Sequence, residues 1–345
     1  MQETLKLLRL DAHFWDYLYV PCIIQRRLFQ DGWGSHQVLE KLQMPDPIPF
    51  DEIKVPKVKL IEKKMTGEGI FCSYKFTTTS SHKPIPRQVK TSYFDLILPH
   101  QSLSKKKSTP VFIHFPATGD ASLFLRKQFV ARPLLKQGIG SLIIQSPFYG
   151  VRKPNYQNGT EIRTVTDLML LGVLSIEEGR SLLKWLHSMG FGPLGLTGIS
   201  RGGLIAAIVA AITPLPLAVV PFIPTHSGGV TFTEGLIQLS CEWEQLNKQL
   251  ERTKGYQNYC SKQRLFEILE QTNITNFPPP MRPDAAICIS AKKDGLVSPW
   301  STEVFRQYWP GSEIRMINGG HVSAIALRLG KLRQAVCDSL VRLNT

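Results

Sequence analysis

The stretch GLTGISRGG at residues 195–203 decides how the rest of this sequence is interpreted, because it joins one apolar run to another. Its centre matches the pattern G-x-S-x-G, which is typical of a sharp strand-to-helix turn that exposes a serine hydroxyl above a sheet. We expect glycine to be required at Gly198 and Gly202, because a Cβ at either position would collide with the neighbouring strand or helix. Taken alone, the pattern also fits a small serine in a tight turn. The role of Ser200 therefore depends on the sequence around it.

The order of the predicted elements indicates an α/β fold, with a mostly parallel sheet and helices on both of its faces. From about residue 110 onward, short β-rich apolar runs alternate with helix-length segments. Two upstream segments, 69–79 and 91–99, alternate like an antiparallel hairpin, so we expect a mixed sheet. The other expected strands are 110–115, 140–148, 194–197, 217–223, 285–291 and 313–317, and the expected helices are 122–138, 161–189, 202–212, 299–309 and 322–343.

The charge and length of the chain bound the classes of protein it can belong to. Its 345 residues carry a net charge of +14 and are 43% hydrophobic, which is enough for a large core. The charge favours an anionic partner, such as an acidic membrane surface or an anionic substrate. The only basic run, SKKKS at 104–108, is more typical of a solvated loop, and no zinc-finger spacing is present. Nucleic acid therefore ranks low as a partner.

The cysteines and the longest uncharged segment bear on the compartment. Six cysteines occur without a C-x-x-C pair, and no leader of signal-peptide form precedes them, so we expect free thiols in a reducing, intracellular compartment. Residues 202–225 carry no charge, but prolines divide them into a helix-length and a strand-length piece. We expect a buried helix and a buried strand there, not a membrane span.

A serine hydroxyl becomes a nucleophile only when a base takes its proton, and the base needs a carboxylate to orient it. Asp294 follows a predicted buried strand, in ICISAKKDGLVSP, and His321 follows the next strand, in EIRMINGGHVSA. Both would lie at the carboxyl edge of the sheet, in the chain order Ser, Asp, His. Singly, Asp294 also fits a plain turn and His321 a helix start. Together with Ser200 they predict a catalytic triad.

Acyl transfer also needs backbone N–H groups to stabilise an oxyanion. The residue after the nucleophile, Arg201, supplies the first. The second would come from the loop HFPATGD at 114–120, where Pro116 has no N–H, so Phe115 and Ala117 are the candidates. No cofactor or metal motif accompanies these residues, and we expect a cofactor-free enzyme.

The motifs HFPATGD, ARPLL, SPFYGVRKP, GPLGLTGISRGG, WPGSEIRMINGGHVSA and RQAVCDSL together resemble the α/β-hydrolase domain-containing protein 18 family. The resemblance covers nearly the whole chain. It implies an α/β-hydrolase fold with Ser200, Asp294 and His321 at the triad positions. It also implies hydrolysis of a lipid acyl ester, with deacylation of a phospholipid of the cardiolipin type in mitochondria as the expectation.

On this basis we expect a helical extension at 1–45, a hydrolase domain in two parts, 46–223 and 285–345, and a helical cap inserted at 224–284. The segment HFWDYLYVPCIIQRRLFQDGWG, 13–34, mixes aromatic and basic residues, which is typical of an interfacial segment and equally of a helix packed on the domain. With the net charge, it favours peripheral contact with an anionic membrane. The residues named for this contact are Trp15, Tyr17, Tyr19, Arg26, Arg27, Trp33, Arg152 and Lys153.

The predicted activity is hydrolysis of a carboxylic ester through an acyl-serine intermediate. The alternative is a non-catalytic, hydrolase-like protein that binds a lipid or another protein, because a fold alone does not establish an activity. Arg201, where the family pattern has an apolar residue, and Pro116, where a small residue with an N–H is usual, keep this alternative open.

Overall fold

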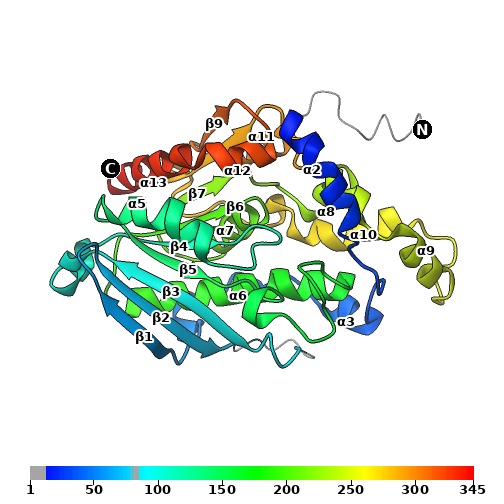
Figure 1. Ribbon diagram of the computed structural model, residues 1–345, viewed down its shortest axis with the longest axis horizontal. Helices are drawn as coiled ribbons and strands as arrows, with labels where there is room; N and C mark the ends of the chain where they lie inside the picture. Colours follow the sequence, from blue (N-terminus) through cyan, green and yellow to red (C-terminus); the bar gives the residue numbers. More distant parts are fainter. Residues whose placement is uncertain (1–12, 79, 81–84) are drawn as a thin grey trace.

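A computed structural model describes residues 13–78, 80 and 85–345, so the first twelve residues of the expected N-terminal extension lie outside it (Figure 1). Within these residues, nine strands form one sheet in the order β1-β2-β3-β5-β4-β6-β7-β8-β9. The strands are β1 (Lys59–Met65), β2 (Ile70–Thr77), β3 (Thr91–Leu98), β4 (Val111–Phe115), β5 (Gly140–Ile144), β6 (Leu194–Ile199), β7 (Ala218–Phe222), β8 (Ile287–Ala291) and β9 (Glu313–Ile317).

Helices follow most of the strands. They are α2 (Phe14–Gln25), α3 (His36–Lys41), α4 (Phe124–Arg126), α5 (Arg132–Leu135), α6 (Val165–Ser188), α7 (Arg201–Ala211), α8 (Gly228–Thr233), α9 (Trp243–Glu251), α10 (Ser261–Leu269), α11 (Pro299–Tyr308), α12 (His321–Leu327) and α13 (Leu329–Asn344). Short 3₁₀ turns lie at Phe50–Glu52, His100–Leu103, Lys106–Ser108, Gly150–Arg152, Leu236–Ser240, Glu270–Thr272, Ile274–Asn276 and Pro283–Ala285.

The sheet is mixed, as the sequence predicts. β3 runs antiparallel to β2 and β5, whereas the five pairings from β5–β4 across to β8–β9 are parallel. β2 and β3 form the expected hairpin. Because parallel strands end at the same edge of a sheet, the loops after β4, β6, β8 and β9 gather there.

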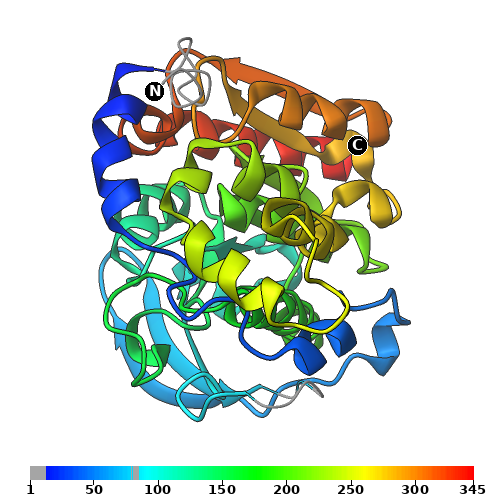
Figure 2. The ribbon, with the colours of Figure 1, turned by 90° about the vertical axis from the view of Figure 1, so that its right-hand side faces the viewer.

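Helices cover both faces of the sheet (Figures 1 and 2). The alternation of side chains along β4 divides the core into two clusters. Phe112 packs in a cluster with residues of α5 and α13 on one face. Its neighbours Val111 and Ile113 pack in a larger cluster with residues of α6, α7 and α11 on the other face. Since successive side chains of a strand point to opposite faces, a five-residue strand contributes to both clusters. The predicted α/β fold is confirmed.

The structure differs from the sequence prediction at one edge strand and at two of the expected helices. β1, which the sequence did not predict, is an edge strand whose seven residues are all exposed. The helix expected at 322–343 is two helices, α12 and α13, that meet at Arg328, whose backbone leaves the helical region at φ −119° and ψ 13°. The helix expected at 122–138 contains a π-helical segment, Lys127–Ala131, between α4 and α5.

Residues 224–284, the expected cap, contain α8, α9 and α10 joined by short turns. Between α8 and α9 lies the 3₁₀ turn Leu236–Ser240. In Figure 1 these helices and α2 lie together at one end of the molecule. α2 contacts both the 3₁₀ turn and α12, so the N-terminal segment lies against two later parts of the chain. The division into domains remains a prediction.

Two residues named for membrane contact are buried, so that part of the hypothesis is wrong. The Trp33 indole is fully buried and donates its N–H to the Leu246 carbonyl oxygen at 3.0 Å. The Arg152 guanidinium is fully buried and paired with Glu178. None of the helices in the described residues has the length and apolarity needed to cross a membrane.

The Arg152–Glu178 pair is the most deeply buried ion pair of the described chain, and it yields a test of the fold. Its two parallel hydrogen bonds measure 2.6 and 2.9 Å, and Arg152 also donates to the Val89 carbonyl oxygen at 2.7 Å. Glu178→Ala would leave a buried, uncompensated guanidinium. We expect the free energy of unfolding to fall by about 3–5 kcal/mol, measured by denaturant titration. Asp51→Ala, which removes an exposed partner of Lys184, should leave the transition midpoint nearly unchanged.

Candidate active site

Ser200 lies in a strained turn between β6 and α7. Its φ of 55° and ψ of −121° fall in a region that non-glycine residues rarely adopt. Its N–H donates to the Phe222 carbonyl oxygen of β7 at 2.9 Å, and its own carbonyl oxygen accepts from Gly203 at the start of α7. The backbone of Ser200 is therefore hydrogen-bonded both to the sheet and to the first turn of α7.

The two glycines flanking Ser200 allow this turn, as the sequence predicts. A Cβ on Gly198 would lie 2.1 Å from the Gly202 carbonyl oxygen, and one on Gly202 would lie 2.4 Å from the Phe115 carbonyl oxygen at the end of β4. Both distances are far inside van der Waals contact with backbone atoms, which cannot move aside without disturbing the sheet. The pattern G-x-S-x-G is thus a steric requirement here.

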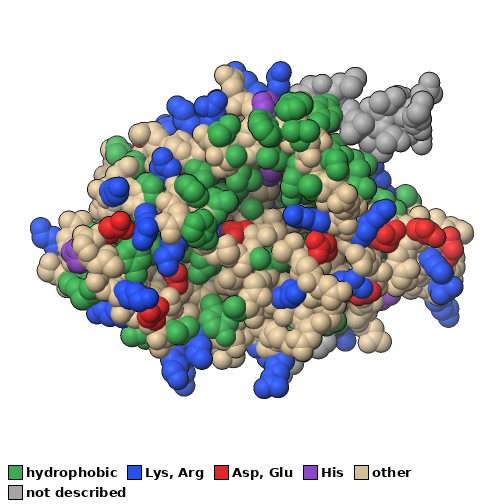
Figure 3. Space-filling view, in the orientation of Figure 1, with side chains coloured by type: hydrophobic (Ala, Val, Ile, Leu, Met, Phe, Trp, Pro, Cys, Tyr) green, Lys and Arg blue, Asp and Glu red, His purple; other side chains and the backbone are tan. Residues whose placement is uncertain are grey.

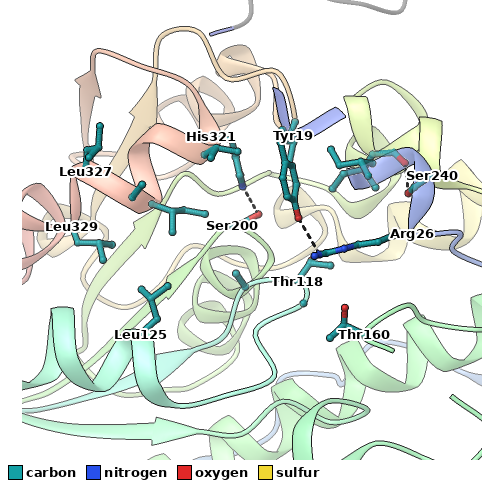
Figure 4. Close-up of a pocket in the computed structure, with 18 of the residues that line it drawn as sticks. Tyr19, Arg26, Thr118, Leu125, Thr160, Ser200, Ser240, His321, Leu327 and Leu329 are labelled. Carbon is teal, nitrogen blue, oxygen red and sulfur yellow. Dashed lines mark hydrogen bonds between the residues drawn. The ribbon is translucent and has the colours of Figure 1, made fainter. Parts of the chain in front are cut away.

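The structure brings Ser200, His321 and Asp294 together, although they come from three different loops. The Ser200 Oγ lies 3.0 Å from the His321 Nε2, and the His321 Nδ1 lies 2.7 Å from the Asp294 Oδ2. All three side chains are buried among protein atoms. Figure 4 shows the hydrogen bond between His321 and Ser200.

Asp294 is held in one orientation by the backbone that follows it. Its Oδ1 accepts from the N–H groups of Leu296 at 2.9 Å and Val297 at 2.8 Å, which leaves Oδ2 for His321. An ionised carboxylate only accepts hydrogen bonds, so the His321 Nδ1 donates to it. The Nε2 of the neutral imidazole then accepts the Ser200 O–H, which is the arrangement a general base requires.

The pKa of His321 reflects opposing effects. Burial lowers it, because a charged imidazolium loses hydration. The Asp294 carboxylate raises it through its charge and its hydrogen bond, and the charge of Asp16 raises it further. The carboxylates outweigh burial, so the pKa of His321 lies above its ordinary value.

The predicted oxyanion donors take different positions. Arg201 is the first residue of α7, and its backbone N–H therefore has no hydrogen-bond partner within the helix. Ala117 lines the cavity beside Ser200, followed by Thr118 and Gly119. Phe115 is fully buried in β4 and in register with Gly198 of β6. The Ala117 backbone is therefore the nearer of the two candidates to the cavity.

The Arg201 side chain, which departs from the family pattern, is directed into the protein. Its guanidinium donates to the Ser146 Oγ at 3.0 Å and lies over the Tyr149 ring, 5.8 Å from the ring centroid. The same guanidinium also lies 3.5 Å from the carbonyl oxygens of Pro116 and Ala117, so the charge contacts the loop that carries the second candidate donor.

Ser200 and His321 form part of the wall of a cavity of about 600 Å³. In Figure 4 the labelled leucines lie on one side of Ser200, and Arg26, Thr160 and Ser240 lie on the other. Apolar side chains line the cavity on both sides of Ser200: Leu125, Phe129, Leu327 and Leu329 on one side, and Ile23, Ile237 and Leu296 beside α2 on the other. The polar and charged lining residues are Tyr19, Arg26, Thr160, Glu161, Ser240 and Arg333. The cavity can therefore take a mainly apolar molecule that carries a polar group.

Sequence reasoning missed the contribution of α2 to this site. Tyr19 and Ile23 of that helix and Arg26, which directly follows it, line the cavity, and the Arg26 guanidinium donates to the Tyr19 hydroxyl at 3.2 Å. Asp16 of the same helix bonds to the backbone around His321. The aromatic and basic composition of 13–34 marked the segment, but no motif connected it to residues some 300 positions away.

No group of three or more metal-ligating side chains occurs among residues 13–78, 80 and 85–345. All six cysteines are free thiols, and burial raises the pKa of the Cys241 and Cys288 thiols, which disfavours the thiolate at both positions.

Comparisons with known proteins show the family and the fold of this chain. A family model described as "Alpha/beta hydrolase domain containing 18" matches residues 26–265 and 257–342. Acetyl xylan esterase 1 from Thermoanaerobacterium sp. JW/SL YS485 is 12% identical, with a TM-score of 0.54, over 88% of this chain and 99% of that chain. The acetyl xylan esterase from Paenibacillus sp. R4 is also 12% identical over the same shares, with a TM-score of 0.56. The α/β hydrolase GrgF from Penicillium sp. sh18 is 15% identical over 79% and 98%, with a TM-score of 0.52. The chain thus shares the α/β-hydrolase fold of these three proteins, two of which are acetyl xylan esterases.

The raised pKa of His321 can be measured directly. In a chain labelled at histidine, NMR titration should place the midpoint of the His321 imidazole above the ordinary value of about 6.5. Asp294→Asn should move that midpoint down, because it removes the larger of the two favourable charges. An unchanged midpoint in Asp294→Asn would contradict the pairing.

Proposed function

Because the chain belongs to the α/β hydrolase domain containing 18 family, we propose that it is a serine hydrolase that cleaves a carboxylic ester. The observation that carries the proposal is the continuous hydrogen-bonded chain from Ser200 through His321 to Asp294 at the wall of the cavity. Buried polar side chains in this order are the arrangement by which a hydroxyl becomes a nucleophile.

In the proposed first step, the Ser200 Oγ attacks the ester carbonyl carbon while its proton moves to the His321 Nε2. Asp294 keeps the imidazole in the required tautomer and stabilises its positive charge. The tetrahedral intermediate then collapses, the bond to the alcohol breaks, and Nε2 returns the proton to the leaving oxygen. Water repeats the sequence on the acyl-serine, and this releases the carboxylic acid and restores the Ser200 hydroxyl.

The proposed oxyanion donors are the backbone N–H groups of Arg201 and Ala117. The position of Arg201 at the first turn of α7 supports the first assignment, because that N–H has no partner within the helix and lies at the positive end of the helix dipole. The place of Ala117 in the cavity wall supports the second. The inward course of the Arg201 side chain is compatible with both.

We further propose that the substrate is a lipid acyl ester. The leucines and Phe129 on one side of Ser200 suit an acyl chain, and Arg26 on the other side suits a polar or anionic group on the alcohol side. A phospholipid of the cardiolipin type, the expectation drawn from the family resemblance, has this division of character. A small polar ester would leave the apolar parts of the cavity unfilled.

Peripheral contact with an anionic lipid surface is the second part of this proposal. Figure 3 shows apolar side chains gathered over α2 and α12, around the hollow that leads to the cavity. We define the apolar rim as the exposed side chains Phe14, Trp15 and Leu18 of α2, Leu327 of α12, and Phe129 of the π-helical segment Lys127–Ala131. Arg26 and Arg333 line the same cavity and supply positive charge near the rim. Scattered basic charge around an exposed apolar patch is typical of lipid-binding surfaces.

A fluorophosphonate probe tests the catalytic part. We expect covalent labelling of the wild-type protein at Ser200 and its loss in Ser200→Ala and His321→Ala. Asp294→Asn should lower ester turnover on the order of 10,000-fold. Ser102→Ala, which alters another buried serine in the turn before β4, should label like the wild type. A folded wild-type protein that stays unlabelled even with anionic vesicles present would favour the non-catalytic binding protein instead.

Vesicle sedimentation tests the surface contact. We expect the protein to bind vesicles that contain anionic lipid more strongly than neutral vesicles, and to bind more weakly as salt increases. The double variant Trp15→Ser, Leu327→Ser should bind less than the wild type. The matched control, Leu60→Ser with Ile61→Ser, alters exposed apolar side chains on β1 and should bind normally. Equal, salt-insensitive binding to both vesicle types would contradict the proposal.

A further inference from the structure

Asp16 is a fully buried carboxylate that the proposed mechanism does not use. It lies in the first turn of α2, and its side chain is turned into the protein. A carboxylate is buried at this depth only when hydrogen bonds or charges compensate the loss of water. Its partners therefore indicate what it does.

The hydrogen-bond partners of the Asp16 carboxylate are three backbone N–H groups beside the triad. Its Oδ2 accepts from Gly295 at 2.9 Å and from His321 at 2.8 Å, and its Oδ1 accepts from Val322 at 2.9 Å. Gly295 directly follows Asp294 in the chain. One carboxylate thus joins the loop that carries Asp294 to the residue that carries the imidazole.

The fit around Asp16 is tight on the opposite side as well. A Cβ on Gly320 would lie 2.4 Å from the Asp16 Oδ2 and 2.6 Å from the His13 Cβ. The glycine before His321 therefore leaves the space that the Asp16 carboxylate fills. The backbone ladder of β8 and β9 is continued by a bond from the Lys293 N–H to the Gly319 carbonyl oxygen, and the Asp16 bonds take over where that ladder ends.

We propose that Asp16 is a positioning residue, which fixes the distance and orientation between Asp294 and His321 and so makes α2 part of the active site. The proposal rests on the proposed function of Ser200, His321 and Asp294. The Asp16 Oδ2 accepts hydrogen bonds from the backbone of His321 and from that of Gly295, which follows Asp294. It does not touch the reacting atoms.

The charge of Asp16 gives this role a signature that simple anchoring of α2 would lack. The negative groups that face His321 are Asp294 in the loop after β8 and Asp16 in α2, and both raise the pKa of the imidazole against the lowering effect of burial. From β6 and α7 the neighbouring group is the neutral Ser200 hydroxyl. Lys292 and Lys293, in the loop that carries Asp294, are exposed to solvent.

The experiment compares Asp16→Asn, which keeps the shape and removes the charge, with Asp16→Glu, which keeps the charge and moves the carboxylate. Turnover of a short nitrophenyl ester is followed against pH. Both variants should lower kcat by about 10- to 100-fold with little change in KM, because the triad is displaced by a fraction of an ångström to an ångström. Only Asp16→Asn should shift the acid limb of the profile to lower pH, because the His321 pKa falls when a negative charge is lost.

Asp31→Asn is the matched control, because it neutralises an acid of the same N-terminal segment that pairs with Arg163 on the surface. It should have the wild-type profile. Wild-type kcat and an unshifted acid limb in Asp16→Asn would overturn the proposal. A rise in KM alone, with kcat unchanged, would also overturn it and assign Asp16 to the cavity wall. If Asp16→Asn melts below the assay temperature, unchanged kcat in Asp16→Glu overturns the proposal.

Failure of the proposed function can be distinguished from failure of this inference. A wild-type protein without Ser200-dependent turnover would remove the function, whatever Asp16 does. NMR titration of His321 needs no turnover, so it still reports on the contact. A lower midpoint in Asp16→Asn than in the wild type supports the electrostatic contact, and an unchanged midpoint overturns it.

Discussion

The strained backbone of Ser200 is the constraint on which the rest of the site depends. A positive φ at this residue lets β6 end and α7 begin within one position, so the side chain projects from the sheet edge and stays out of either element. The turn holds only because Gly198 and Gly202 let the helix start and the end of β4 approach within ordinary contact of each other. The loops that carry His321 and Asp294 then meet Ser200 because parallel strands end at the same edge.

Much of the fold and all three triad positions follow from local patterns. The buried strands β4 to β8 are short apolar runs between helix-length segments, and their order fixes a parallel sheet. Asp294 and His321 could be singled out because each comes just after such a strand. The glycine pattern around Ser200 and the chain order Ser, Asp, His can be recognised without knowledge of any long-range contact.

Other features could not be predicted, since they depend on contacts between distant parts of the chain. β1 is exposed on both faces, so no alternation of apolar residues marks it. Arg152 occurs in a basic loop and was interpreted as a surface residue, but Glu178 of α6 removes it from water. Asp16 belongs to a segment that mixes aromatic and basic residues, and its burial depends on partners 279 to 306 positions later. In these cases the type of residue does not indicate which distant residue it will contact.

The hydrogen bonds between α2 and the loops that carry Asp294 and His321 also affect the order in which the chain folds. Contacts at such sequence separation close a loop that spans almost the entire chain, and contacts of this kind form late in folding. During synthesis on the ribosome, α2 is made before β8 and β9, so the Asp16 carboxylate has no partner until the loops after these strands exist. A nascent chain that lacks β8 and β9 would hold the turn at Ser200 but neither Asp294 nor His321, and the three side chains could not yet meet.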